Sequence, residues 1–221
     1  MAEELWVAGS AIPDAESLIR SFCGLPGPDG TAITWDYAYY DARPSAPGDD
    51  VTPEDVNAAA AFGFRVTRPV LEGFDRARPH IAAVLRELPS DLPFEDADDN
   101  VLETIERLFA GIVTDDESSD LAIPGSDRTI VGAVLHRKRP RLIPLYNRSI
   151  VDRYALAHKD KSQGRGVNLL RNMRTDLQDP RNAEALRAIQ SRLAVDLDGR
   201  PVPSRLRLFD IALWMESRVP P

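Results

Sequence analysis

The chain has 221 residues, 43% of them hydrophobic and 28% charged, with a formal net charge of −8. This length and composition allow a large buried core and predict a soluble globular protein, because no apolar run approaches the roughly 18 residues of a membrane-spanning helix. A single cysteine excludes an internal disulfide and every four-cysteine zinc or iron–sulfur site. The amino-terminal residues lack the basic start and apolar stretch of a signal peptide, so we expect a cytoplasmic protein without a membrane partner.

The charges are segregated along the sequence. Residues 1–127 carry 8 Lys and Arg against 26 Asp and Glu, whereas residues 128–192 carry 15 against 5. We predict a single domain over residues 1–221. A possible subdivision is an acidic helical part at 1–122 and a basic, helix-hairpin-helix-like part at 123–221. The basic part either offers a surface to a polyanion or is neutralised by the acidic part, and the sequence leaves both readings open.

Apolar residues at helical spacing predict a mostly α-helical, multi-helix globular bundle. At most one small extended segment is expected, at residues 4–8 or 32–40. Thr52 is a predicted N-cap with Pro53 in the first helical turn, and Pro79 predicts a break or kink within a later helix. The predicted helices cover residues 14–22, 52–62, 70–87, 97–113, 128–137, 149–158, 167–177, 182–195 and 203–214.

Two stretches of the first half have both a structural and a functional reading. The only cysteine, Cys23, lies in the apolar stretch 18–25, which predicts a buried thiol rather than a nucleophile. A second stretch is aromatic and could form either a short extended segment or a lid over a pocket. Its aromatic residues are Trp35, Tyr37, Tyr39 and Tyr40.

The middle of the chain carries a family resemblance. From Leu135 to Asn147 the sequence reads Leu-His-Arg-Lys-Arg-Pro-Arg-Leu-Ile-Pro-Leu-Tyr-Asn. This stretch resembles Leu-Ala-Arg-Lys-Arg-Pro-x-Leu-Val-Pro-Val-Tyr-Asp in an uncharacterised actinobacterial family of unknown function. Residues 49–56 and 206–215 look similar to the same family. The resemblance implies a shared fold and leaves the activity open.

The same region more distantly resembles the helix-hairpin-helix DNA glycosylases. Their pattern is Leu-Pro-Gly-x-Gly-Arg-Lys-Thr-Ala, then a helix and a proline-containing loop that leads to a catalytic Asp. The resemblance implies a helix-hairpin-helix-like element that contacts DNA, and here Asn147 occupies the position of the family's Asp. The residues that match the hairpin pattern are Ile123, Pro124, Gly125 and Arg128.

The hairpin has an anion-binding reading and a structural one. Gly125 can supply a tight turn, after which the N–H groups at the start of a helix would approach a phosphate. Asp127 stands where the second glycine of the pattern belongs, and its carboxylate would repel that phosphate. The residue is instead well suited to cap the helix that starts at Arg128, and we favour this structural reading.

The catalytic residues of the resembled glycosylases are replaced in this chain. Asn147 cannot take a proton or supply a negative charge, and Thr129 occupies the position of the lysine that lyase-competent members use. Asp152, five residues beyond Asn147, is a candidate substitute, although we expect it to pair with a neighbouring Arg. The catalytic assignment therefore stays open, and the resemblance implies a glycosylase-like core whose base excision is lost or altered.

A dense basic cluster is the main candidate for nucleic-acid binding. It lies at the end of a predicted helix and in the loop after it, where prolines stiffen the chain. If these side chains face solvent, they would contact the phosphate backbone and position the protein on DNA without base specificity. The alternative is that they neutralise a helix C-terminus and pack their stems against neighbours. The cluster comprises Arg137, Lys138, Arg139 and Arg141, with Arg148 beyond it.

The sequence thus favours a nucleic-acid-binding protein with a degenerate glycosylase-like core and no robust base excision. Two alternatives stay open. One is an enzyme that acts on a small molecule or an unusual DNA lesion in a pocket near Asn147, and the other is a protein-interaction module without catalysis. No cofactor is predicted. The dispersed histidines, His80, His136 and His158, predict no metal site.

Overall fold

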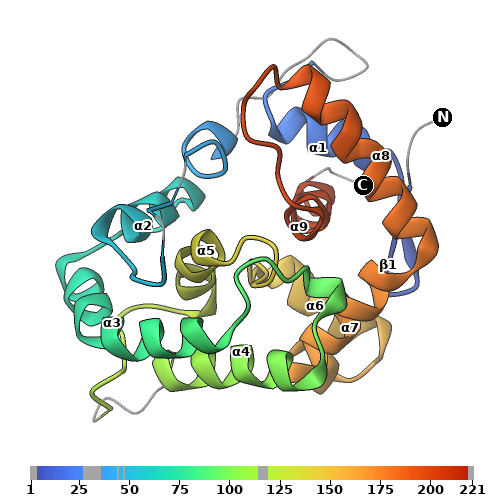
Figure 1. The fold of residues 1–221 in the computed structure, drawn as a ribbon. Coiled ribbons are helices and arrows are strands. Elements are labelled where there is room, and N and C mark those ends of the chain that lie inside the picture. Colours follow the sequence, from blue (N-terminus) through green and yellow to red (C-terminus); the bar gives the residue numbers. More distant parts are fainter. Residues whose placement is uncertain (1–3, 27–35, 44, 47, 114–118, 219–221) are drawn as a thin grey trace. The chain divides into compact units, whose positions relative to one another are not determined.

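A computed structural model describes residues 4–26, 36–43, 45–46, 48–113 and 119–218 (Figure 1). The described residues are mostly helical, with one two-stranded antiparallel sheet, which confirms the predicted fold class. The predicted helices are all present, and their ends lie within a few residues of the expected positions. No described helix combines the length and the apolar composition needed to cross a bilayer.

The chain packs into two compact units. The terminal unit comprises Met1–Arg43, Phe94–Asp96 and Asn147–Pro221, and the central unit comprises Pro44–Pro93 and Ala97–Tyr146. Each unit therefore combines acidic and basic stretches of the sequence. The prediction of a single domain over residues 1–221 stays a prediction.

The terminal unit begins with a β-hairpin. Strand β1 (Leu5–Val7) pairs with β2 (Ser10–Ile12), and Trp6 lies opposite Ala11. The two turn residues, Ala8 and Gly9, both have positive φ, as a two-residue hairpin turn of the right twist requires. The extended segment predicted at residues 4–8 is therefore confirmed.

The helices of the terminal unit are packed around α9 (Arg205–Glu216). Nine of its twelve residues are buried, and it contacts α1, α6, α8 and β2, because a helix that is apolar on nearly all sides belongs in a core. The buried guanidinium of Arg207 on α9 forms a two-pronged ion pair with Asp41 at 2.8 and 2.9 Å. The other elements are α1 (Ala15–Phe22), α6 (Arg148–Ala157), η4 (Lys161–Gly164), α7 (Gly166–Gln178) and α8 (Pro180–Asp196).

The aromatic stretch belongs to the core of the terminal unit. Tyr37 lies in the short 3-10 helix η1 (Asp36–Ala38), is buried and donates its hydroxyl to the carbonyl of Pro201, while Tyr40 is also buried. We predicted an extended segment or a lid over residues 32–40, and the described part, residues 36–40, is a 3-10 helix and turn with Tyr37 and Tyr40 in the core, so it forms neither. Trp35 lies outside the described residues.

The central unit consists of α2 (Pro53–Ala58), η2 (Ala59–Phe62), α3 (Arg68–Glu87), α4 (Asp99–Ile112) and α5 (Arg128–Lys138). Thr52 caps α2 as predicted, and Asp55 reciprocates by accepting the Thr52 N–H at 3.1 Å. Helix α3 continues through Pro79, so the proline does not end it. Gly73 on α3 is packed so tightly that a Cβ there would lie 2.9 Å from the Ile123 side chain.

Helix α5 is the core helix of the central unit, with eight of its eleven residues buried. Gly132 allows close approach of Tyr146, because an added Cβ would lie 3.3 Å from the Tyr146 ring and backbone nitrogen. Tyr146 in turn packs edge-on against Phe109 of α4. The basic residues at the carboxyl end of α5 therefore belong to a helix that is almost fully surrounded by protein.

Candidate functional site

The basic cluster at the end of α5 is buried. The side chains of Arg137, Lys138 and Arg139 are 5%, 0% and 6% exposed, respectively. The prediction that these three side chains face solvent and contact a phosphate backbone is therefore wrong. Their charges are neutralised within the central unit, as the alternative reading of the charge segregation expected.

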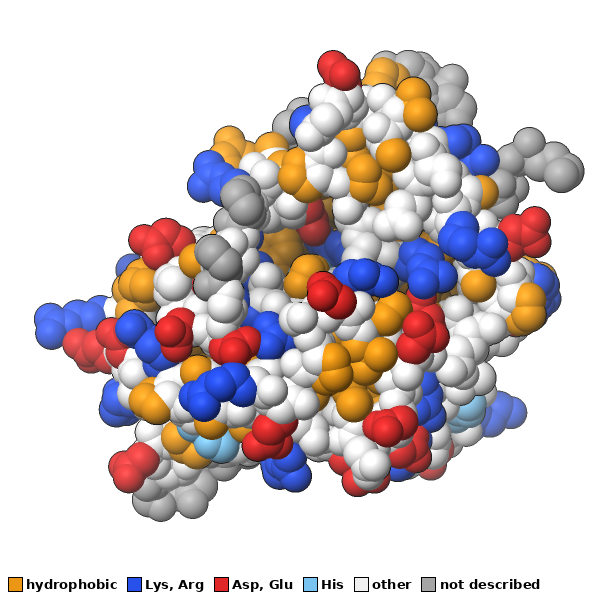
Figure 2. Space-filling model, viewed as in Figure 1, with side chains coloured by type: hydrophobic (Ala, Val, Ile, Leu, Met, Phe, Trp, Pro, Cys, Tyr) orange, Lys and Arg blue, Asp and Glu red, His pale blue; other side chains and the backbone are white. Residues whose placement is uncertain are grey.

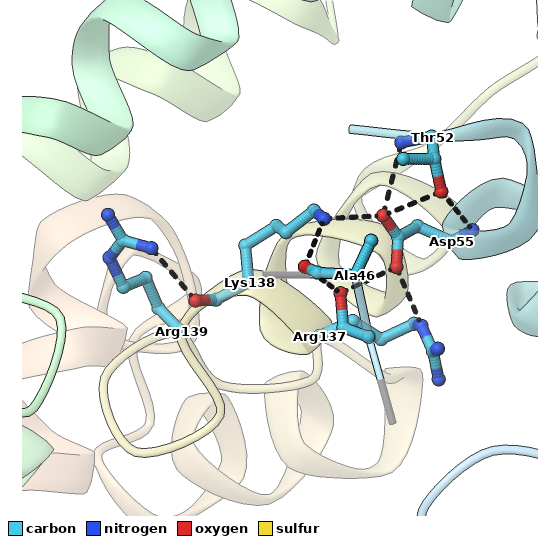
Figure 3. Close-up of polar contacts among 7 residues, drawn as sticks. Ala46, Thr52, Asp55, Arg137, Lys138 and Arg139 are labelled. Atoms are coloured by element: carbon cyan, nitrogen blue, oxygen red, sulfur yellow. Dashed lines mark hydrogen bonds and ion pairs between the residues drawn. The ribbon is translucent and has the colours of Figure 1, made fainter. Parts of the chain in front are cut away.

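Asp55 is the centre of this ion-pair network (Figure 3). Its Oδ2 accepts from Lys138 Nζ at 2.7 Å, and its Oδ1 accepts from Arg137 Nε at 3.1 Å and from the Ser45 hydroxyl at 2.7 Å. Burial disfavours the ionised carboxylate, but hydrogen bonds from Lys138, Ser45 and Thr52 outweigh this effect and lower the pKa of Asp55. The carboxylate is therefore a structural anion that holds two cations in the core.

Arg139 connects the carboxyl ends of two helices. Its guanidinium pairs with Asp49 and donates to the carbonyls of Leu85 (2.6 Å) and Lys138 (2.9 Å), which lie in the last turns of α3 and α5. Carbonyls at a helix C-terminus have no partner within the helix, and a cation there also interacts favourably with the helix dipole. All of these donor groups serve the fold, so Arg139 is not available to a nucleic acid.

The two remaining residues of the predicted basic surface are exposed but belong to different units. Arg141 lies in the central unit, and Arg148 lies in the terminal unit with its side chain 93% exposed. On the face drawn in Figure 2, Lys and Arg side chains lie among Asp and Glu side chains. The charge segregation of the sequence is thus not repeated as one basic area in that view.

The predicted hairpin turn is present, and its N–H groups are already occupied. Gly125 has φ +71°, and the Asp127 carboxylate accepts from the N–H groups of Thr129 and Ile130 at 2.9 and 3.0 Å, which confirms Asp127 as the cap of α5. Arg128 pairs with Glu106 at 2.7 Å. The groups that a phosphate contact at Gly125 and Arg128 would use are therefore engaged by carboxylates of the chain itself.

Asn147 and Asp152 also have local partners. The Asn147 side-chain oxygen accepts from the N–H of Ile150 at 2.9 Å and caps α6. Asp152 pairs with Arg148 one turn away at 3.3 Å, which confirms the expected pairing with a neighbouring Arg. Both side chains therefore make local contacts within the amino-terminal half of α6.

Cys23 and His136 are both buried. Cys23 is buried, and burial together with the nearby Asp41 carboxylate raises the pKa of its thiol to about 12, so the thiol is protonated and unreactive as predicted. His136 is buried with its Nδ1 2.6 Å from the carbonyl of Ile143. Among the described residues, no group of three His, Cys, Asp or Glu side chains is arranged to hold a metal ion.

The terminal unit has a groove of about 600 Å³ along α6 and η4, which we call the α6–η4 groove. Apolar side chains from one side of α6 meet cations from the segment that follows it. Leu156 is 76% exposed and is one of three large hydrophobic side chains that the described residues expose, with Tyr39 and Val195. The lining residues are Val151, Asp152, Ala155, Leu156, Lys159, Asp160, Lys161 and Arg165.

The segment that carries the cations is held firmly against α6. A Cβ at Gly164 would collide with the backbone oxygen of Val151 and lie 3.1 Å from the Ala155 side chain, so only glycine fits there. The Asp160 carboxylate accepts from the Ser162 N–H at 2.9 Å and hydroxyl at 2.8 Å, and these bonds lower its pKa. The groove is therefore formed by a tightly packed turn.

Helix α6 ends at the edge of the groove in a conformation that favours glycine. The N–H of Lys159 donates to the carbonyl of Leu156 and that of Asp160 to the carbonyl of Ala155, both at 3.1 Å, which is the bonding pattern of a Schellman motif. Lys159 occupies its left-handed position with φ +51°. A lysine there costs stability relative to glycine, and such strain is often retained at functional positions.

The groove cations differ from the α5 cluster in being exposed. Lys159, Lys161 and Arg165 are exposed, and none of them has an ion-pair partner among the described residues. Of the two carboxylates, Asp152 pairs with Arg148, and Asp160 is used in the cap of η4. This site was not predicted from the sequence, although Lys-Asp-Lys-Ser-Gln-Gly-Arg directly after a helix places three cations against one acid.

The comparison with known families covers nearly the whole chain. The model of a family of unknown function, DUF6308, matches residues 15–217. The chain belongs to this family. The match confirms the predicted relation to a family of unknown function and supports neither an actinobacterial origin nor the resemblance to DNA glycosylases. No curated protein and no solved structure matches the chain significantly. The α6–η4 groove lies within the matched region of this DUF6308 member.

Proposed function

We propose that this protein binds nucleic acid through the α6–η4 groove, and that it does so without removing bases. The observation that carries the proposal is the set of three exposed cations, Lys159, Lys161 and Arg165, at the edge of one groove. Phosphate contacts of this kind supply affinity without sequence specificity. A cytoplasmic location is part of the proposal.

The charge of the surrounding segment supports this site over the α5 cluster. Residues 147–192 carry 10 Lys and Arg against 5 Asp and Glu in a chain of net charge −8, and although Arg153, Arg181 and Arg192 pair with carboxylates, the three groove cations have no such partner among the described residues. The acidic remainder repels a polyanion over long distances, so the affinity should be modest and should depend strongly on salt. Three phosphate contacts predict that log K falls with log salt concentration with a slope of about −2 to −3.

The absence of base removal is proposed from the role of Asn147. Its amide oxygen caps α6, and a neutral amide cannot stabilise positive charge on a sugar or activate water as a carboxylate does. Asp152, the candidate substitute, is paired with Arg148. An enzyme in a pocket near Asn147 would need a different catalytic group.

The proposal is tested by a salt titration of binding to a fluorescent 20-nucleotide single strand of random sequence. The double variant Lys161→Gln/Arg165→Gln should reduce the slope by about 1.4, because each of the two lost contacts contributes about 0.7 on a single strand. The control Arg68→Gln/Arg187→Gln removes the same charge from exposed positions outside the groove and should leave the slope nearly unchanged. Equal losses in both double variants would show non-specific attraction, and no binding by the wild type would reject the function.

A further inference from the structure

The α6–η4 groove offers apolar surface beside its cations, and this combination selects among nucleic acids. We propose that the groove binds single-stranded nucleic acid, with an unstacked base against Leu156 and the adjoining phosphates on the cations. This inference rests on the proposed nucleic-acid binding. It adds that the protein prefers a single strand to a duplex.

The apolar side of the groove is built from one face of α6. Val151 and Ala155 are four residues apart on that face, and the neighbouring Leu156 projects with 76% of its surface exposed. A duplex presents phosphates and groove edges while its base faces are stacked inside, so it would leave this apolar surface in water. A single strand can turn a base face toward it, and the base would then bury apolar surface against Leu156.

The cations stand where the phosphates of the same nucleotides would lie. Lys159 and Lys161 flank Asp160 at the end of α6, and Arg165 follows at the start of α7, so all three line the same groove as Leu156. The volume of about 600 Å³ is in the range of small-ligand sites, roughly 300–1,000 Å³, and suits one or a few nucleotides rather than a duplex. The ligand class is thus an anion with a flat apolar part.

The backbone at Lys159 holds one groove cation in a left-handed conformation, which Ala8, Asp14 and Asp198 also adopt outside the groove. The left-handed conformation of Lys159 would be less costly for glycine, yet the position carries a cation that lines the groove. The left-handed residue after α8, Asp198, does not line the groove and so allows a matched comparison. The tight packing of Gly164 on α6 holds the backbone of the segment that carries the cations against the helix that carries Leu156.

The test compares an oligothymidylate of twelve nucleotides with a blunt duplex of twelve base pairs at low salt, by fluorescence anisotropy. The wild type should bind the single strand at least about tenfold more tightly, and Leu156→Ala should weaken single-strand binding about fivefold while leaving duplex binding unchanged. The control Val195→Ala truncates a side chain of equal exposure (77%) on α8, outside the groove, and should change neither affinity.

The outcomes separate this inference from the proposed function. One possible result is that the wild type binds both oligonucleotides equally, that Lys161→Gln/Arg165→Gln abolishes this binding and that Leu156→Ala does not affect it. This result would overturn the single-strand inference and leave nucleic-acid binding in place. Binding of neither oligonucleotide would overturn both. Two further probes are vesicles that contain phosphatidylserine and a polyglutamate peptide. Tighter binding to either one, sensitive to Leu156→Ala, would assign the groove to a lipid surface or an acidic protein and overturn the inference.

Discussion

Lys138 and Asp55 form an ion pair in which neither side chain is exposed to solvent, with Nζ and Oδ2 2.7 Å apart. Arg137 shares the same carboxylate, and Lys138 also donates to the carbonyl of Ala46 at 3.0 Å. A buried carboxylate that serves two cations cannot be removed without leaving charge unpaired in the core. This relationship explains why the densest basic cluster of the chain contributes to stability rather than to a surface.

The first prediction concerns the loss of this carboxylate. Asp55→Asn should lower the free energy of unfolding by about 3–5 kcal/mol, because Lys138 and Arg137 would stay buried without an anion. Asp49→Asn is the comparison, since Asp49 pairs with Arg139 but is 28% exposed, and it should cost clearly less. Urea unfolding followed by circular dichroism measures both. Equal effects of the two substitutions would contradict the central role of Asp55.

The second prediction concerns pH. The folded-state pKa of Asp55 lies below its ordinary value, so its contribution to stability is complete above the unfolded-state pKa and is lost as pH falls through the folded-state value. The stability gap between the wild type and Asp55→Asn should therefore be widest near pH 7 and narrow below about pH 4. Urea midpoints measured from pH 2.5 to 7 test this. A gap independent of pH would show that folding does not lower the pKa of Asp55.

The third prediction separates stability from binding at Lys159. Lys159→Gly should raise the free energy of unfolding by about 1 kcal/mol, because glycine adopts the left-handed position without steric cost. The same variant should weaken single-strand binding, since it removes a groove cation. Asp198→Gly relieves the same strain after α8 and should stabilise the protein without affecting binding. Unchanged binding by Lys159→Gly would exclude this lysine from the site.

The fourth prediction concerns Asn147. Asp and Asn cap helices equally well, so Asn147→Asp should leave stability within about 0.5 kcal/mol of the wild type, whereas Asn147→Ala should cost about 1 kcal/mol. The wild type should release no base from duplexes that contain uracil or a methylated purine. Gel analysis of alkali-treated substrate measures that release. Efficient base removal by the wild type would contradict the proposed absence of excision.

The β-hairpin supplies the fifth prediction. Asn182 of α8 is buried and bonds to the backbone of Trp6 as a neighbouring strand would. Its Oδ1 accepts the Trp6 N–H at 2.7 Å, and its Nδ2 donates to the Trp6 carbonyl at 2.6 Å. Asn182→Ala leaves both backbone groups unsatisfied and should cost about 2–4 kcal/mol in unfolding free energy. Asn172→Ala on α7 is a milder control, because Asn172 is only half-buried. Similar losses in both variants would argue against a special role for Asn182.

Local patterns predicted the elements well and their environments poorly. The cap at Thr52, the turn at Gly125 and the cap at Asp127 all depend on residues within three or four positions, and all three are present. The aromatic stretch that ends at Tyr40 was misassigned, because burial of Tyr37 and Tyr40 outweighs the extended preference of aromatic residues. The α6–η4 groove was missed, since exposure of Leu156 has no signature in the sequence.

The sequence by itself determined where helices begin and end, because capping, glycine and proline act through neighbouring atoms. It also determined that acidic and basic residues are segregated along the chain. Only the tertiary structure decided which cations meet solvent, because that depends on partners far away in the sequence. Arg137 and Asp55 are 82 positions apart and share a buried bond, whereas Lys159, Lys161 and Arg165 are exposed and form no ion pair with a described carboxylate.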